Sequence, residues 1–526
     1  MRLSGIRLEA HRGAARQCPE NTMAAFRCAA AQGYDVIELD LDRTRDGEFI
    51  VLHDRTVNRT ARLPDGAPLP AETRLAALTY AEAARLDFGV AHDARFRGER
   101  IPRFRDVLAW ARDVGVRLKI DNKIWQESAD FRAKLFDLLQ KSGAPVSITA
   151  QSVPFAAEAR QALPTVPIDY DGPVTEDTLR ALRAFLPRED LTVWLPLDCA
   201  ATHWVKTPRA DAENTALVRR YAQLGLWLIC SEADFARAAA FAPDIVETDG
   251  TIVPIHPAAL HDLHTHSHHS HDSRCAVPDM AAAAAAHGLA GFAVTDHCDI
   301  AERDRLDLAG NAAASAAEAR SVGARAGIEI GEAIRHPDTA AEVLRRTQFD
   351  VVLGSVHTVR MAGYDFPYSQ IDFGQMDAPT LDAFLRQYFA DLLETAQTCD
   401  FDVLAHLTCP LRYINGRYGR GVDAHDYADA IHSVLDAVYR RGIALEVNTS
   451  GMAPGAAYCV PMPERWILAD YYALGGRMLT IGSDAHAAEN CARAFRETAA
   501  LLRNIGFRYT LDYANRVPVA YAIPGD

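Results

Sequence analysis

The alternation of short apolar runs with helical stretches is the feature that most constrains the fold of this chain. In the first half, runs typical of buried strands lie at residues 36–41, 49–52, 116–120, 146–150, 191–195, 226–230 and 245–247. Stretches with helical periodicity lie between them, at 21–32, 104–114 and 131–141. Strands that alternate with helices form a parallel sheet, and about eight such repeats predict a closed α/β barrel of the TIM type, (β/α)8.

The second half repeats this alternation with a new set of strand-like runs. They lie at residues 291–294, 351–353, 403–404, 444–447 and 478–481. A chain of 526 residues is too long for one ordinary hydrophobic core. We therefore expect two α/β barrels in two domains, residues 1–256 and 257–526, joined without a long linker.

Composition and charge exclude several classes of function. The formal net charge of −15 argues against a broad nucleic-acid surface, which needs clustered Lys and Arg, so no nucleic-acid partner is expected. No run approaches the roughly 18 apolar residues of a membrane span, which argues against stable membrane insertion. The N-terminus lacks an apolar signal core, and the ten cysteines form no Cys-x-x-Cys pair. We expect a cytoplasmic protein with reduced thiols, and nothing in the sequence indicates its oligomeric state.

Chemically active side chains of the first half fall at the ends of strand-like runs. Glu38 and Asp40 alternate along one run and therefore share a face. Together with Asp121 they repel one another unless a cation compensates them, and oxygen ligands favour Mg²⁺, Ca²⁺ or Mn²⁺. His11 and His53 beside such a cation could act as general acid and base. Each residue alone has an ordinary structural explanation, but five of them in barrel order predict a site.

The motifs around these residues resemble those of the glycerophosphodiester phosphodiesterase family. The matching segments are His11-Arg12-Gly13, Pro19-Glu20-Asn21-Thr22, Glu38-Leu39-Asp40, His53-Asp54, Arg59-Thr60, Gln151-Ser152 and Thr248-Asp249. The resemblance covers roughly residues 5–256. The metal ligands that it implies, for Mg²⁺ or Ca²⁺, are Glu38, Asp40 and Asp121. The implied acid/base pair is His11 and His53, and the implied phosphate contacts are Arg12 and Lys123. The family cleaves glycerophosphodiesters to glycerol phosphate and an alcohol.

One residue departs from the pattern of that family. Asp121 stands where the family usually has Glu, so its side chain is shorter by one carbon–carbon bond of roughly 1.5 Å. Asp121 could still ligate a metal after a small strand shift or through a water, or it could weaken the metal site. A misplacement of about 1 Å can cost an enzyme much of its rate.

The second half contains a separate set of metal-type side chains, most of which follow strand-like runs. They are His264, His266, Asp272, His297, Glu329, His357, His406, Asp484 and His486. Nine such positions exceed what one ion can use, so two or three metal ions are expected. Imidazole-rich sites suit Zn²⁺, Mn²⁺ or Fe²⁺, and such ions bind phosphate oxygens and activate water.

Several residues near this set allow more than one interpretation. Six histidines lie between residues 261 and 271, and a His-rich tract is either a surface metal binder or simply polar. We interpret four of them as bystanders, namely His261, His268, His269 and His271. Glu332 is an alternative to Glu329. Arg412 is either a phosphate clamp or a surface arginine.

The order of these motifs resembles the PHP family, which is named for polymerase and histidinol phosphatase domains. The matching elements are the opening His-x-His, Thr-Asp-His, Gly-Ile-Glu, Gly-Ser-Val-His and the closing Gly-Ser-Asp-Ala-His. The resemblance covers about residues 258–500. It implies a distorted (β/α)7 barrel and assigns all nine positions as metal ligands.

Together, the two resemblances favour a bifunctional, metal-dependent phosphoric ester hydrolase acting on small phosphate esters. The first barrel would cleave a glycerophosphodiester, and the second would remove phosphate from a monoester, with histidinol phosphate as one candidate. The alternative is that only the PHP half is catalytic, as a phosphatase or phosphodiesterase, and that the first barrel is a binding or docking module. A metal store would give the pair His11 and His53 no purpose, and the acidic charge argues against a nuclease.

Overall fold

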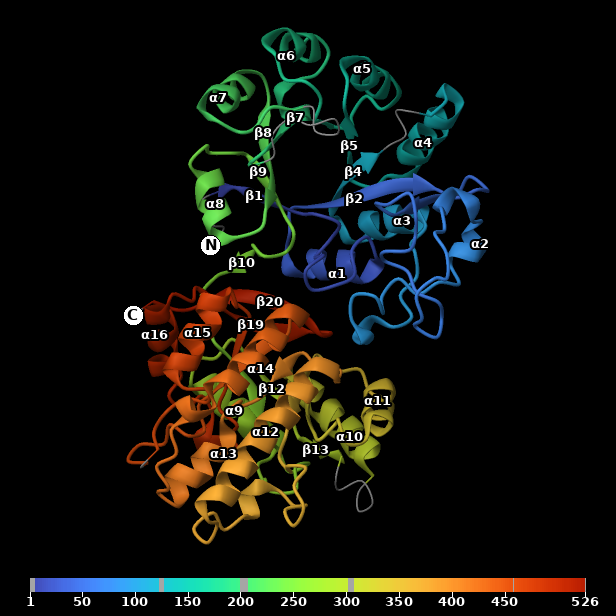
Figure 1. The fold of residues 1–526 in the computed structure, drawn as a ribbon. Helices are drawn as coiled ribbons and strands as arrows, with labels where there is room; N and C mark the ends of the chain where they lie inside the picture. The colour runs from blue at the N-terminus through green and yellow to red at the C-terminus, as the bar shows by residue number, and fades with distance from the viewer. Residues whose placement is uncertain (1–4, 123–126, 199–206, 301–306, 457, 526) are drawn as a thin grey trace. The chain divides into compact units, whose positions relative to one another are not determined.

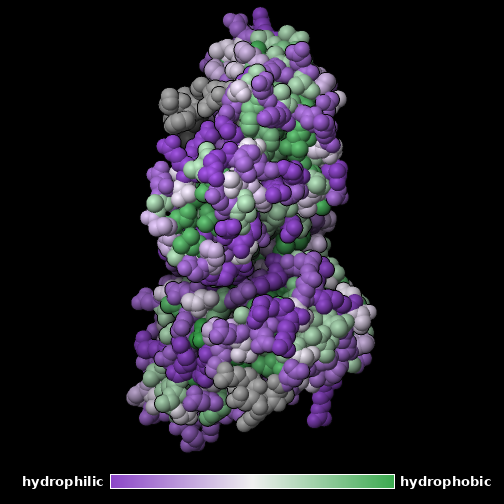
Figure 2. Space-filling model, turned by 90° about the vertical axis from the view of Figure 1, so that its right-hand side faces the viewer, coloured by the Kyte–Doolittle hydropathy of each residue, from purple (hydrophilic) through white to green (hydrophobic). Residues whose placement is uncertain are grey.

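The computed structural model describes residues 5–122, 127–198, 207–300, 307–456 and 458–525. The chain divides into two compact units, one ending at Pro254 and the other beginning at Ile255. In the described ranges, no helix is both long and apolar enough to cross a membrane. The face of each unit seen in Figure 2 is covered mostly by hydrophilic residues, with hydrophobic residues scattered between them.

The first unit is a closed parallel barrel surrounded by helices (Figure 1). Its strands are β1 (Arg7–Ala10), β2 (Val36–Arg43), β4 (Arg117–Asn122), β5 (Val146–Ala150), β6 (Ile168–Tyr170), β7 (Leu191–Pro196), β8 (Gln223–Ile229) and β9 (Ile245–Thr248). Strand β1 pairs in parallel with both β9 and β2, which closes the barrel. The predicted (β/α)8 barrel is confirmed.

The run at 49–52 is not one of the barrel strands. It forms β3 (Phe49–Val51), which pairs antiparallel with the end of β2. The connection at 44–48 is too short for the crossover that a parallel pair needs, so the chain turns back as a hairpin. This hairpin carries the chain onward to His53.

The helices of the first unit alternate with its strands, and polar side chains cap most of them at the N-terminus. They are α1 (Met23–Gln32), α2 (Tyr80–Ala83), α3 (Phe104–Val114), α4 (Ala129–Ser142), α5 (Val153–Ala162), α6 (Glu176–Arg183), α7 (Ala212–Tyr221) and α8 (Glu232–Ala239). Thr22 caps α1 and Ser152 caps α5, each with its side-chain oxygen accepting from a backbone N–H. These caps fix the loops at the carboxyl ends of the strands, where barrel enzymes place their sites.

The second unit is a nearly closed barrel of seven parallel strands, as predicted. The strands are β11 (His261–Thr265), β12 (Gly291–Val294), β14 (Arg325–Gly331), β15 (Val351–Ser355), β16 (Val403–Leu404), β17 (Ala444–Asn448) and β18 (Leu479–Gly482). A short strand, β13 (His297–Asp299), pairs with β14. The seam between the first and last strands is closed by backbone hydrogen bonds, from Asp484 to His264 and from His266 to Ala485.

Helices and one hairpin complete the second unit. The helices are α9 (Val277–Ala286), α10 (Leu308–Ser321), α11 (Pro337–Arg346), α12 (Ala378–Thr398), α13 (Cys409–Leu411), α14 (Ala428–Arg441), α15 (Arg465–Leu474) and α16 (Phe495–Ile505). The hairpin of β19 (Tyr509–Ala514) and β20 (Val517–Ala522) forms a small sheet with β10 (Ile255–His256). One large hydrophobic cluster, from Val277 to Ile523, packs the helices against the barrel.

Candidate active sites

The carboxylates expected in the first unit lie on two neighbouring barrel strands. Glu38 and Asp40 are on β2, and Asp40 is the register partner of Asp121 on β4. Burial raises the pKa of Glu38 well above its usual value, and the negative charge of Asp40 adds to this rise. Ionised carboxylates are therefore unfavourable here on their own, and a hard cation bound between them would remove this penalty.

The turn after β1 places Arg12 in contact with Glu38 and Asp40. Its backbone N–H donates to Glu38 Oε2 at 2.8 Å, and its Nε lies 3.1 Å from Asp40 Oδ2. The next residue, Gly13, has φ +80° and packs so closely that an added Cβ would meet Ala25 of α1 at 2.7 Å. Glycine is therefore required at this position, because α1 could not otherwise approach the turn.

A chain of ion pairs links the turn after β1 to the loop after β3. Asp54 Oδ1 accepts from His53 Nδ1 at 2.6 Å, and Asp54 Oδ2 accepts from Arg59 Nε at 2.7 Å. Glu20 in turn accepts from both Arg59 and Arg12. Burial opposes ionisation of Asp54, but the hydrogen bonds from Arg59 and His53 outweigh it and lower its pKa to about 2. This charged Asp54 fixes the His53 ring with Nδ1 protonated.

His11 has a different partner, on the last barrel strand. Its Nε2 lies 4.0 Å from Glu247 Oε1. Burial lowers the pKa of His11, and the charge of Glu247 opposes this effect only in part. A neutral imidazole can accept a proton, so His11 is suited to act as a base.

Beneath this site lies a buried ion cluster that sequence reasoning missed. Lys119 Nζ donates to Glu9 and to Glu247, each at 2.7 Å, and it lies 3.7 Å from the ring centroid of Trp194. The alternation along β1, β4 and β9 contained the signal, because Glu9, Lys119 and Glu247 each occupy an inward position. The remaining expected residue, Lys123, lies outside the described residues.

In the second unit, the expected ligands converge on the carboxylate of Glu329. Its Oε2 lies 3.0 Å from His297 Nδ1 and 3.2 Å from His264 Nε2. Its Oε1 lies 2.8 Å from His406 Nε2 and 3.1 Å from His357 Nε2. Glu329 is completely buried, so its carboxylate and the ring nitrogens that face it are shielded from water.

Neighbouring carboxylates fix the orientation of two of these rings. Glu446 Oε1 contacts His264 Nδ1 at 2.7 Å, and Asp299 Oδ1 contacts His357 Nδ1 at 3.0 Å. A carboxylate only accepts, so both Nδ1 atoms carry a proton, and in the neutral rings both Nε2 atoms present lone pairs toward Glu329. Orientation of this kind is typical of metal-binding histidines.

A serine orients the ring of His266 so that its Nδ1 also carries the proton. The Ser270 hydroxyl donates to Asp296 Oδ1 at 2.8 Å, so its oxygen accepts from His266 Nδ1 at 3.0 Å. The Nε2 atoms of His264 and His266 face each other at 3.0 Å, and in the neutral rings each of them carries a lone pair. Two lone pairs at this distance repel, and a cation bound to both removes the repulsion. The donor set therefore fits metal ions.

Asp484 and Asp272 extend the cluster toward the solvent. Asp484 Oδ1 lies 3.2 Å from His266 Nε2, and Asp272 Oδ2 lies 3.1 Å from His486 Nε2. Asp484 has φ +52°, a left-handed conformation that turns its side chain back toward His264. At Gly482, two residues before Asp484, a Cβ would lie 2.2 Å from Glu446 Oε1, so only glycine leaves room for that carboxylate.

Electrostatics in the cluster favour bound cations. Burial opposes ionisation of Glu329, yet the surrounding His357 and His264 hold its pKa well below the usual value. Burial also opposes protonation of His264, but Glu446 and Glu329 raise its pKa well above the usual value. The carboxylates thus stay ionised and draw positive charge onto the rings, whether as protons or as metal ions.

A cavity of about 210 Å³ opens over this cluster. It is lined by both metal-type residues and a second group, which comprises Pro367, Tyr368, Ser369, Cys409, Arg412 and Tyr413. Arg412 Nη1 donates to Ser450 Oγ at 2.8 Å and lies 3.8 Å from Asp484 Oδ2. It starts a π-helical segment at 412–417, a rare conformation found often at functional sites. Arg412 therefore faces the cavity rather than the outer surface.

Two carboxylates near the cluster, Asp299 and Glu446, were not expected as site residues. Asp299 and Glu446 orient histidines, and their only sequence signal was the end of a strand-like run. Glu332, the alternative to Glu329, accepts instead from the backbone N–H groups of His357 and Thr358. The bystander His271 lines the cavity, with Nδ1 4.0 Å from Asp299 Oδ2.

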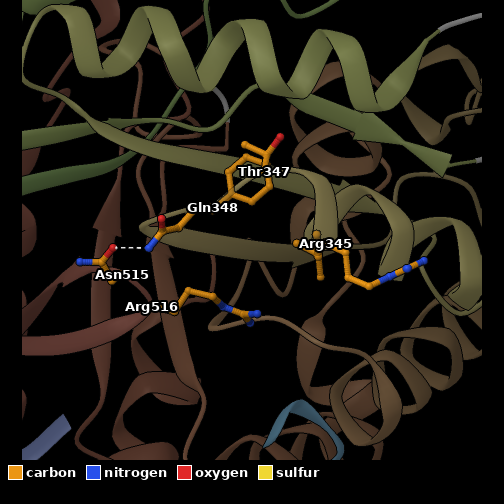
Figure 3. A pocket seen from close by; sticks show the side chains of 7 residues that line it. Arg345, Thr347, Gln348, Asn515 and Arg516 are labelled. Carbon is orange, nitrogen blue, oxygen red and sulfur yellow. Dashed lines mark hydrogen bonds between the residues drawn. The ribbon is translucent and has the colours of Figure 1, made fainter. Parts of the chain in front are cut away.

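Another cavity of the second unit, of about 310 Å³, offers different chemistry. It lies between the end of α11 and the β19–β20 turn, where Gln348 Nε2 donates to Asn515 Oδ1 at 2.9 Å (Figure 3). The lining Arg516 already pairs with Asp400 and Asp402. Its charge is therefore neutralised within the fold, and this cavity lacks the metal-type cluster of the first.

Two parallel barrels with titratable clusters at their strand ends define a pair of α/β-barrel hydrolase sites. Comparison with known proteins agrees: the Glycerophosphoryl diester phosphodiesterase family model matches residues 11–156, and the PHP domain model matches residues 262–450. The first half of the chain belongs to the glycerophosphodiester phosphodiesterase family and the second half to the PHP family. The chain is a phosphoric ester hydrolase by these relationships.

Individual relatives match each half separately. A "Probable histidinol-phosphatase" of Deinococcus radiodurans is 30% identical over 249 residues, 45% of this chain and 90% of that protein. A "Putative glycerophosphodiester phosphodiesterase YhdW" of Bacillus subtilis is 30% identical over 188 residues, 34% of this chain and 72% of that protein. A glycerophosphodiester phosphodiesterase of Caldanaerobacter subterraneus is 39% identical over 114 residues, 22% of this chain but only 44% of that protein.

A solved structure also resembles the second unit. Histidinol phosphate phosphatase from Lactococcus lactis, determined with zinc, L-histidinol and phosphate, is 21% identical. The match covers 50% of this chain and 99% of that one, with a TM-score of 0.39.

Proposed function

We propose that the chain is a bifunctional, metal-dependent phosphoric ester hydrolase. The first unit cleaves glycerophosphodiesters, and the second removes phosphate from small phosphomonoesters. The observation that carries the second assignment is the convergence of imidazole lone pairs on Glu329, with their tautomers fixed by Glu446, Asp299 and Ser270. Such a donor set needs positive charge, as protons or as metal ions, and histidines oriented in this way by carboxylates are typical of metal sites.

In the second unit, the nine expected residues would hold two or three ions of the Zn²⁺, Mn²⁺ or Fe²⁺ type. Such ions supply Lewis acidity toward phosphate oxygens and activate water. Arg412 provides a permanent positive charge at the cavity wall, where it can bind a phosphate oxygen beside Asp484. The cavity of about 210 Å³ suits a small phosphomonoester.

In the first unit, Glu38, Asp40 and Asp121 would hold Mg²⁺ or Ca²⁺, which compensates their charge and binds phosphate. Arg12 lies beside this group and can contact a phosphate oxygen. His11, neutral in its buried position, accepts a proton from the attacking hydroxyl. His53, held by Asp54, donates a proton to the leaving alcohol.

Two variants of the full chain test this assignment. Glu38→Ala removes a carboxylate of the first site, and Glu329→Ala removes the centre of the second. With glycerophosphocholine and glycerol phosphate as substrates, Glu38→Ala should stop alcohol release from the diester and leave phosphate release from the monoester intact. Glu329→Ala should do the reverse. Diester cleavage that survives Glu38→Ala would refute the first assignment.

The alternative, a docking role for the first barrel, makes a different prediction in the same experiment. Wild-type protein would release no alcohol from any diester, and Glu38→Ala would change nothing. The shorter Asp121 is the observation that keeps this alternative open, because it is the one departure from the family pattern in this site.

A further inference from the structure

A separate cluster of metal-type side chains lies beside the loop that follows β11. His268 and His269 on this loop face Glu318 of α10. Glu318 Oε2 is 2.9 Å from His269 Nε2 and 3.5 Å from His268 Nε2. The three ligand atoms all lie within 4.8 Å of one another, and none of these residues belongs to the cluster around Glu329.

The hydrogen bonds of Asn311 determine the proton position on His269. The Asn311 side-chain Nδ2 donates to the backbone carbonyl of His269 at 2.8 Å. A carbonyl only accepts, so this bond fixes the amide orientation and turns Asn311 Oδ1 toward His269 Nδ1, at 3.4 Å. That oxygen also only accepts. His269 Nδ1 therefore carries the proton, and in the neutral ring Nε2 presents a lone pair to Glu318.

A lone pair and a carboxylate oxygen at 2.9 Å require a positive charge between them. A single divalent ion supplies this charge to all three groups, because His268 Nε2 approaches the same carboxylate oxygen at 3.5 Å and the two imidazole rings have centroids only 4.3 Å apart. Its ligand atoms would lie about 3.3 Å apart in a tetrahedral Zn²⁺ site, close to the separations observed.

We propose that His268, His269 and Glu318 form a further binding site for a divalent cation of the Zn²⁺ class. The His269 side chain is 15% exposed and that of His268 is 46% exposed. One side of the site is thus open, and water completes the coordination. The Asn311–His269 contact orients the less exposed of the two histidines, as expected for a built metal site.

The position of the site gives the ion a structural role. The same loop carries Ser270, which fixes the ring of His266, and Asp272, which contacts His486. An ion held between this loop and α10 therefore restrains the loop that completes the neighbouring cluster. This inference concerns binding alone and does not depend on the proposed hydrolytic activity.

Zinc binding by the full chain tests the proposal. Wild type, His269→Ala and Glu318→Gln are dialysed against buffers of fixed free Zn²⁺, and bound zinc is measured per chain. We expect both variants to bind one equivalent less than wild type over a range of free Zn²⁺. The matched control is His432→Ala, which removes the ring from an exposed His432–Asp470 pair with a 2.9 Å contact. This control should bind as much zinc as wild type.

Identical zinc isotherms for wild type and both variants would overturn the proposal and leave ordinary His–Glu ion pairs. Circular dichroism and thermal unfolding of the variants show whether a loss of zinc reflects misfolding. Anomalous diffraction at the zinc edge from wild-type crystals provides a test without any substitution. A peak between His269 and Glu318 is expected, and its absence at saturating Zn²⁺ would refute the site.

Discussion

Asp121 is the residue on which the activity of the first unit most depends. It faces Asp40 in register, but its carboxylate reaches one methylene less far than the Glu usual in the family. We predict that Asp121→Glu tightens Mg²⁺ binding by the first unit, by roughly tenfold, because the longer side chain reaches the ion without a strand shift. Calorimetric titration in a Glu329→Ala background measures this affinity.

The control Asp113→Glu makes the same change at an exposed position and should have no effect. An unchanged affinity would show that Asp121 already reaches the ion.

Glu446 is a residue whose importance only the structure reveals. One of its oxygens accepts from His264 Nδ1 and the other from the backbone N–H of His406 at 2.7 Å. Glu446→Gln cannot satisfy both donors, because an amide has a single acceptor oxygen. We predict that this variant loses about 10- to 100-fold in metal affinity at the second site. Competition with a chelator measures it, and Glu464→Gln, which perturbs a contact with Tyr458, is the matched control. Retained affinity would mean that Glu446 does not orient the ligand.

At the scale of elements, the sequence predicted barrel strands well and their side connections poorly. Glu38 and Asp40 could be predicted as neighbours, because strand alternation places both side chains on one face. The antiparallel pairing of β3 depends on a short connection that hydrophobicity does not reveal. Asp299 and Glu446 were missed because they act by orienting histidines distant in sequence. Contacts of that kind arise only when strands assemble.

Strand β4 carries a prediction of its own. Lys119 lies buried between Glu9 of β1 and Glu247 of β9, so it links three strands. Burial opposes its charge, but Glu247 and Glu9 raise the pKa of Lys119 well above its usual value. We predict that Lys119→Met destabilises the first unit by about 3–5 kcal/mol, because it leaves buried carboxylates without a partner.

Urea unfolding of the full chain checks this prediction for β4. The transition of the first unit should move to lower urea, and that of the second should stay in place. Lys141→Met removes another Lys–Asp pair, but one that is exposed on α4, and should change little. A Lys119→Met variant as stable as wild type would show that the carboxylates become protonated at low cost.

At the scale of the whole molecule, the two units have separate strands, cores and clusters. The polar motifs at the ends of strand-like runs allowed both barrels to be predicted from the sequence, because all parallel strands of a barrel end at the same rim. In the described part of the chain, the histidines that contact Glu329, namely His264, His266, His297, His357 and His406, are all among the predicted ligands. The sequence did not indicate which of the neighbouring carboxylates would orient them.

Two sites in one chain lead to a prediction about the intermediate. The groups at both sites reach solvent, with the His53 side chain 40% exposed and that of Asp272 43% exposed. We therefore predict that the phosphomonoester made by the first unit is released before the second unit takes it up.

An equimolar mixture of Glu38→Ala and Glu329→Ala chains should then produce free phosphate from a diester. Its rate should approach that of wild type after a lag that shortens with protein concentration. Each variant alone is the control and should produce none. Phosphate from wild type but not from the mixture would contradict free release and indicate transfer within one chain.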